Sequence, residues 1–137
     1  MSRTFKEDYA VGTLSEQTIK PTLDKFFGPC HKLHEKHTMD FEANNFYIEV
    51  KTRTCSSSAY ETTVLPYFKI EFAQKVTKPV YFVFVFTDGI FYTQYNPEKF
   101  SYYYVEEKFC RKRRADYNDK PKPYIHIPVE ELTKINI

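Results

Sequence analysis

The chain has 137 residues and a mass of 16.4 kDa, the size of one compact domain with its own hydrophobic core. Its formal net charge is only +2, so no global field indicates a nucleic acid or a membrane as partner. The longest apolar run, Val80–Phe86, is far shorter than the ~20 residues of a membrane span. We expect no secretory leader and no disulfide framework, because the N-terminus lacks an apolar stretch and the three cysteines are widely spread. An intracellular, reducing compartment fits best.

The first predicted element is a helix over residues 13–28. Thr13 to Glu16 form a capping box at its start, and Gly28 followed by Pro29 is a typical C-terminal stop. Pro21 should either kink this helix or start a second, shorter one. One apolar face contains Ile19, Leu23, Phe26 and Phe27.

A β-hairpin is predicted next, with strands over residues 38–42 and 46–54. The intervening Ala43-Asn44-Asn45 suits a tight turn, because Asn tolerates positive φ. Side chains alternate along the second strand, so its two faces differ. Phe46, Ile48 and Val50 share one face, whereas Tyr47, Glu49, Lys51 and Arg53 share the other.

The second half of the chain predicts a helix over residues 66–76, with Leu65, Phe68, Phe72 and Val76 at helical spacing. The run Val80–Phe86 is apolar on both faces and predicts an interior strand. Residues 90–95 return as its hairpin partner, residues 125–127 form a last edge strand, and residues 128–132 a short final helix. The order predicts a single mixed α/β domain with a central sheet flanked by helices, its core at about residues 10–95 and an extension at 96–137.

The charged strand face indicates chemistry. Glu49 and Lys51 project to one side of their strand, and eight residues separate Glu49 from Asp40 on the partner strand. A short hairpin can bring the two carboxylates together, and converging carboxylates suit a hard cation such as Mg²⁺. A lysine beside them can orient or deprotonate a metal-bound water, as phosphodiester hydrolysis requires.

Asp40 followed by Glu49-Val50-Lys51 resembles the core motif of the PD-(D/E)XK nuclease superfamily, and the wider run over residues 10–95 resembles its small phage and large-virus members. Met39 stands where the family often has Pro. The resemblance implies a restriction-endonuclease-like core and Mg²⁺-dependent hydrolysis, with Mn²⁺ as a substitute. It also implies products with 5′-phosphate ends.

The resemblance implies a role for each matching residue. Asp40 and Glu49 would be metal ligands, with the Val50 carbonyl as a third, and Lys51 would position the attacking water. Glu16 on the first helix matches a Glu that some members use as an additional metal or water contact, although the capping box needs a Glu there anyway. Lys69, on the second predicted helix and off its apolar stripe, would face the site or be a surface lysine.

Other features remain open between a function and a structural role. Arg53 could touch a phosphate. A run of four adjacent cationic residues consists of Arg111, Lys112, Arg113 and Arg114. This cationic run could bind nucleic-acid backbone, act as a nuclear-localisation-like patch or be a solvated loop. Tyrosines 102–104 could stack on bases or pack in the core. Zinc ligands are another reading of Cys30, His31, His34 and His37, but no second pair follows at suitable spacing.

The function predicted from these features is a metal-dependent nuclease, acting on DNA rather than RNA. Its partner would be nucleic acid and not a membrane. Its place would be the cytoplasm or nucleus, including an infected host cell, and a homodimer is left open because many relatives dimerise. One alternative is a catalytically silent member of the same fold that binds nucleic acid or assembles. Another is an unrelated α/β interaction protein in which Glu49 and Lys51 are merely a solvated face.

Overall fold

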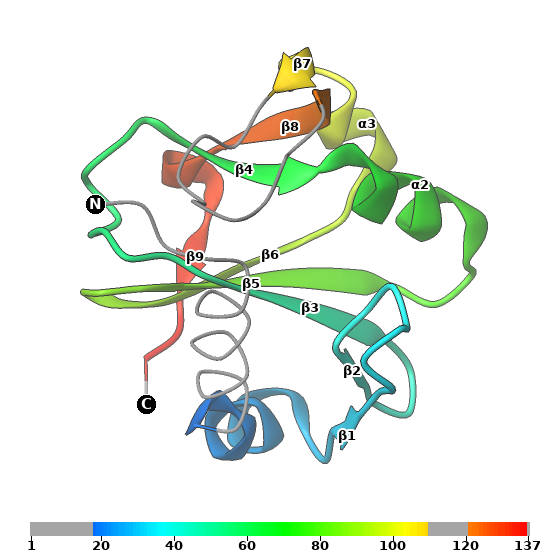
Figure 1. Ribbon diagram of the computed structural model, residues 1–137. Helices are drawn as coiled ribbons and strands as arrows, with labels where there is room; N and C mark the ends of the chain where they lie inside the picture. The colour runs from blue at the N-terminus through cyan, green and yellow to red at the C-terminus, as the bar shows by residue number, and fades with distance from the viewer. Residues whose placement is uncertain (1–17, 110–120, 137) are drawn as a thin grey trace.

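The computed structural model describes residues 18–109 and 121–136 and has a mixed six-stranded sheet as its middle layer (Figure 1). Its strand order is β1-β2-β3-β5-β6-β9, with β3 and β5 parallel and the other neighbours antiparallel. The strands are β1 (His31–Lys32), β2 (Phe41–Glu42), β3 (Tyr47–Thr52), β5 (Val80–Phe86), β6 (Gly89–Gln94) and β9 (Thr133–Lys134).

The two faces of this sheet are covered differently. A helix over residues 18–27 lies on one face, whereas a second sheet and helix α2 lie on the other (Figure 1). The second sheet has the order β4-β8-β7. The elements on this side are β4 (Thr62–Pro66), α2 (Tyr67–Lys75), α3 (Pro97–Phe100), β7 (Val105–Phe109), β8 (Lys122–Pro128) and the 3₁₀ turn η1 (Val129–Glu131). This agrees with the predicted α/β class, but the second sheet was not predicted.

The side-chain alternation of β5 divides the interior into two cores. Phe82 and Phe84 are fully buried and point toward α2 and the second sheet, where they pack with Leu65 and Ile125. Val83 points to the opposite face and packs with Leu23 of the first helix. Because β5 is buried on both faces and paired at both edges, the prediction of an interior strand is confirmed.

The first helix buries the predicted face through Ile19 and Leu23, while Phe26 is 41% exposed. It ends as predicted at Gly28, which has a φ of +90° and donates its N–H to the Asp24 carbonyl at 3.0 Å. A separate helix starting at Pro21 is excluded, because residues 18–20 already belong to the same helix. The capping box at Thr13 to Glu16 lies outside the described residues.

The predicted hairpin forms between β2 and β3, with Phe41 opposite Ile48 and Glu42 opposite Tyr47. The strands are shorter than expected, and residues 38–40 and 53–54 lie outside them. The turn closes through a 2.9 Å hydrogen bond from Ala43 N–H to the Phe46 carbonyl. No described non-glycine residue has a positive φ, so the expected left-handed Asn is not needed here.

Three predictions for the remaining elements were wrong in detail. Leu65 belongs to β4, a strand the sequence did not predict, and Phe68 is 47% exposed rather than on the apolar face of α2. The strand expected at an edge over residues 125–127 is part of β8, which lies between β4 and β7. Instead of a helix over residues 128–132, only the 3₁₀ turn η1 forms. The formation of β4 and the central position of β8 both result from pairing between segments some 60 residues apart in sequence. Such pairing leaves no local signal in the sequence.

Candidate active site

Asp40 is held at the free edge of β3 by two backbone contacts. Its own N–H donates to the Ile48 carbonyl at 3.1 Å, and its carboxylate oxygen Oδ2 accepts the Val50 N–H at 2.8 Å. On β3, only Tyr47 and Ile48 pair with residues of β2. The Asp40 carboxylate therefore accepts the Val50 N–H in place of a backbone carbonyl from a neighbouring strand. The Asp40 charge acts on the Glu49 carboxyl and raises its pKa, so the hairpin brings the two acidic groups near one another.

Glu49 is the most deeply buried acidic side chain of the described residues, with 2% of its surface exposed. It points toward α2, and its Oε2 atom lies 3.1 Å from Lys69 Nζ and 3.4 Å from Lys51 Nζ. Its Oε1 atom is buried and has no hydrogen-bond partner within residues 18–109 and 121–136. The alternative of a solvated strand face is therefore wrong for Glu49.

Burial raises the pKa of Glu49 from 4.5 to about 7, because the charged carboxylate is removed from water. The negative charge of Asp40 raises this pKa further, whereas the Lys51 and Lys69 cations lower it. Near neutral pH the carboxyl group is therefore close to the midpoint of its titration. A cation that bound it would displace the remaining protons.

Lys51 lies beside Glu49, and 28% of its side chain is exposed. Burial lowers the pKa of Lys51 below 10.5, the Glu49 charge opposes this shift, and the nearby Lys69 and Arg53 cations add to it. Proton release from this amine is therefore easier than from a lysine in water. The group is suited to orienting a water molecule and to exchanging a proton with it.

Lys69 is the third charged group of the cluster, and it comes from α2 rather than from the hairpin. Only 11% of its side chain is exposed, and Nζ also donates to the Thr38 carbonyl. Of the two sequence interpretations, a surface lysine is wrong, because Nζ faces Glu49. The spacing of apolar residues predicted the bounds of α2 closely but assigned it the wrong buried face, because it treated Phe68 as buried.

Lys32 on β1 was not predicted and is a further basic residue near the carboxylates. Its Nζ lies 3.8 Å from Asp40 Oδ1 and donates to the Asp40 carbonyl at 3.4 Å. It lies on a two-residue strand in a stretch that the sequence marks only as a polar connection. Lys32 comes near Asp40 through the pairing of β1 with β2. No local sequence pattern shows that pairing, so the sequence offered no signal for this residue.

Arg53 is turned toward the second sheet. Its Nε donates to Thr63 Oγ1 at 3.0 Å, and a terminal nitrogen donates to the Val64 carbonyl. The guanidinium also lies over the Phe84 ring, with 5.9 Å between the guanidinium carbon and the ring centroid. These contacts tie β3 to β4, and phosphate binding by Arg53 remains a prediction.

Several other candidate residues stand apart from this cluster or outside the described residues. Glu16 and the cationic run Arg111, Lys112, Arg113 and Arg114 lie outside them. Within the described residues, no group of three or more His, Cys, Asp or Glu side chains is placed to hold a metal ion. Three of the four suggested zinc ligands have other contacts: Cys30 Sγ donates to the Gly28 carbonyl at 3.2 Å, His34 accepts the Lys36 N–H and His37 accepts the Met39 N–H. Tyr102 and Tyr104 are exposed, and Tyr103 packs on Phe100.

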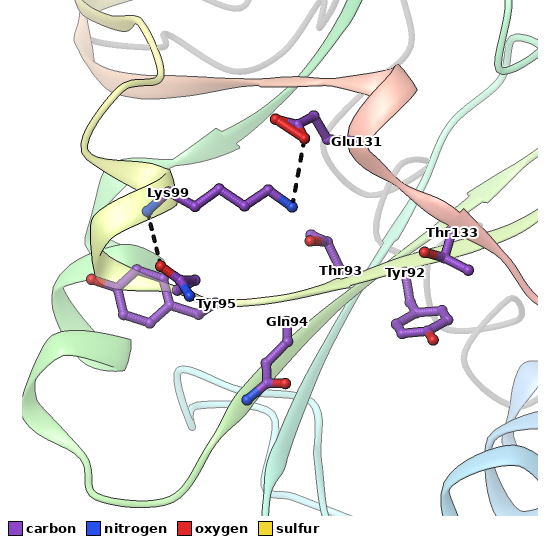
Figure 2. A pocket seen from close by; sticks show the side chains of 8 residues that line it. Tyr92, Thr93, Gln94, Tyr95, Lys99, Glu131 and Thr133 are labelled. Carbon is purple, nitrogen blue, oxygen red and sulfur yellow. Dashed lines mark hydrogen bonds and ion pairs between the residues drawn. The ribbon is translucent and has the colours of Figure 1, made fainter.

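A polar pocket of about 320 Å³ lies elsewhere, between β6, α3 and the C-terminal segment (Figure 2). Lys99 and Glu131 face one another across it, with 3.8 Å between their charged atoms. Thr93 and Gln94 contribute from β6. None of the residues predicted from the sequence to be functional lines this pocket.

The residues around Asp40 and Glu49 fit a hard divalent cation. Glu49 Oε1 is a buried carboxylate oxygen that has no partner in the part of the chain that the structure describes, and oxygen atoms are the ligands that Mg²⁺ takes. The Asp40 carboxylate lies beside it on the same hairpin. Because N–H and C=O of a strand residue point to the same edge, the Val50 carbonyl is expected to face Asp40 as well. Two carboxylates and one carbonyl are sufficient, since Mg²⁺ usually keeps several waters.

A mixed sheet with a Glu-x-Lys strand, an Asp beside that strand and helices packed on both faces agrees with a nuclease of the PD-(D/E)XK type. The chain belongs to the family described as phage putative PDDEXK endonuclease, whose model matches residues 6–135. The predicted superfamily is thereby confirmed. No curated protein matches the chain. Among the helices of the described residues, none combines the length and the apolar character that crossing a membrane requires.

Proposed function

We propose that the chain is an Mg²⁺-dependent nuclease that hydrolyses phosphodiester bonds of DNA and leaves 5′-phosphate ends, with Mn²⁺ able to substitute. The observation that carries this proposal is the buried Glu49 carboxylate, which lies beside Asp40 and two lysines and has one oxygen without a partner among the described residues. Lys51 and Lys69 approach only the Oε2 atom, and leaving the other oxygen of a buried carboxylate unpaired costs free energy. A site of this kind is better explained by a bound cation than by stability.

Within this proposal, Asp40 and Glu49 would hold the ion, with the Val50 carbonyl as a third donor. The ion would supply Lewis-acid stabilisation of the phosphoryl oxygens and a more acidic water. Lys51 follows Glu49 by two residues on the same face of β3, and its Nζ lies beside the Glu49 carboxylate. Its amine would orient the attacking water and stabilise the negative charge that develops on the phosphate.

Lys69 would keep Glu49 in position before substrate arrives. Its ammonium group bridges the Glu49 carboxylate on β3 and the Thr38 carbonyl that precedes β2. Lys69 therefore links β3 and the segment that leads into β2 to helix α2. With Lys32 and Lys51, it also provides positive charge where a phosphate would approach. A place of action inside an infected cell agrees with the phage family.

The test is a cleavage assay with single-stranded, duplex and branched DNA and with RNA, in Mg²⁺, Mn²⁺, Ca²⁺ or EDTA. Cleavage should require Mg²⁺ or Mn²⁺, stop in EDTA and give products that a ligase accepts at their 5′ ends. Glu49→Gln should abolish it. Glu42→Gln is the matched control, because Glu42 lies on the same hairpin but is paired with Lys78 at 2.6 Å.

The same assay distinguishes a nuclease from a catalytically silent member of the fold. A folded wild-type protein that binds DNA but cleaves no substrate in any metal would be a silent binding or assembly module. Cleavage that is unchanged in EDTA, or equal in wild type and Glu49→Gln, would contradict the proposed mechanism.

A further inference from the structure

Two adjacent residues at the start of α2 show the reverse of the usual burial, because the phenylalanine is exposed and the lysine is buried. Phe68 is 47% exposed, whereas Lys69 is 8% exposed. An apolar ring is normally buried and a lysine exposed, because each is then in its favourable solvent. Rotating the helix to correct this would remove Lys69 from Glu49. The exposed ring is therefore a consequence of placing the lysine in the site.

The Phe68 ring lies at the border of the charged cluster. Lys69 Nζ is 5.1 Å from the ring centroid and 3.1 Å from Glu49 Oε2. Because both distances start at Nζ, the ring centroid lies at most about 8 Å from Glu49 Oε2. This is on the order of two nucleotide steps, since successive nucleotides of one strand are about 3.4 Å apart along a duplex. A nucleic acid whose phosphate lay at Asp40 and Glu49 could thus place its neighbouring nucleotide over this ring.

The charges around the ring favour that occupant. Lys51, Lys69 and Lys32 lie within 4 Å of Asp40 or Glu49 carboxylate oxygens, so they surround the position of a phosphate. An aromatic ring beside a track of cations is the arrangement with which proteins hold unpaired nucleotides, because every base has a π-face. Bases inside a duplex are already stacked and offer no free face.

We propose that Phe68 stacks on an unpaired nucleobase next to the scissile phosphate, so that the substrate is single-stranded, branched or frayed at the cleavage position. This inference rests on the proposed nuclease function and names its substrate class. Phe68 is a positioning residue for the substrate and takes no part in the chemistry. Its removal should therefore weaken binding rather than change the metal site.

The chain contains no tryptophan, which permits a direct test. Phe68→Trp and Phe26→Trp each introduce a single indole. Phe26 is a matched control with 41% exposure, because it belongs to the helix over residues 18–27 that covers the other face of the sheet. Each variant is titrated in EDTA with a single-stranded oligonucleotide, its duplex and an abasic strand of equal charge. Fluorescence anisotropy of the labelled DNA reports binding independently of the indole.

The indole at position 68 should be quenched by the single strand, much less by the duplex or the abasic strand, and the indole at position 26 should not respond. Phe68→Leu, which keeps apolar volume, should weaken single-strand binding roughly 5- to 100-fold and leave abasic binding unchanged. Oligonucleotide binding without quenching at position 68 would overturn the stacking but leave the nuclease proposal intact. Failure of wild type to bind any nucleic acid, in EDTA and in Ca²⁺ alike, would overturn both. Quenching that depends on protein concentration alone would show a second copy on this surface and overturn the proposal.

Discussion

Lys69 Nζ on α2 lies 3.1 Å from Glu49 Oε2 on β3, which joins a helix and a strand 20 residues apart in sequence into one site. The hairpin supplies the two carboxylates and Lys51, but the position of the Glu49 side chain depends on α2. The cluster is therefore a product of the whole α2 face of the sheet. Five expected outcomes follow from its geometry and from the cationic run.

Asp40→Asn should weaken Mg²⁺ binding at least about 100-fold, because it removes one of two carboxylate ligands, and loss of an outer partner alone typically costs 10- to 100-fold. The amide can still accept the Val50 N–H, so the fold should persist. Calorimetric titration of metal into wild type, Asp40→Asn and the Glu42→Gln control measures this. Equal affinity in all three would exclude a joint site on Asp40 and Glu49.

Lys51→Ala should bind metal and DNA but lose about 10²–10⁴-fold in kcat, because a positioned acid–base group acts mainly in the transition state. Lys51→Arg should not rescue, since guanidinium is larger and does not release its proton. Single-turnover cleavage in Mg²⁺ and DNA binding in Ca²⁺ separate the two effects. Lys78→Ala, which removes a lysine paired with Glu42, is the control. Wild-type turnover in Lys51→Ala would remove this residue from the mechanism.

The metal-free protein should lose stability as the pH rises from about 4.5 to about 7. The pKa of Glu49 is raised from 4.5 in the unfolded chain to about 7 in the folded protein. The folded state therefore binds this proton more tightly, so the contribution to stability is complete below pH 4.5 and is lost as pH rises through 7. The loss is of order 3 kcal/mol. Urea unfolding at several pH values should show this slope in wild type and not in Glu49→Gln.

Lys69→Met should change the pH dependence of metal binding. The variant loses a cation that lowers the pKa of Glu49, so the carboxyl group ionises at higher pH and Mg²⁺ should bind more weakly than in wild type near pH 6.5. At pH 9 the carboxylate is free of its proton, and loss of a repelling cation should make binding at least as tight. The two affinity curves should therefore cross. Lys99→Met, on α3 and beside Glu131 rather than Glu49, should follow wild type, and parallel curves would show that Lys69 does not act through Glu49.

Replacing the cationic run Arg111, Lys112, Arg113 and Arg114 by Ala should weaken binding to every sequence alike. Each lost duplex phosphate contact should lower the slope of log K against log salt by about 0.9. Cleavage at saturating substrate should continue, because the metal ligands are unchanged. Binding measured between low and moderate salt provides the test. An unchanged slope would mean that this run does not touch the DNA.

The sequence determined what depends on neighbours along the chain. Asp40, Glu49 and Lys51 were found because a two-residue period and a short turn fix which side chains share a face, and β5 was found because both its faces are apolar. Only the tertiary structure decided the rest. The burial of Glu49, and with it the pKa near 7, requires α2 and Lys69 above the strand. The central position of β8 requires pairing with β4, whose partner residues Val64 and His126 are far apart in sequence. Desolvation and long-range pairing depend on elements that meet only after folding, so no local pattern shows them.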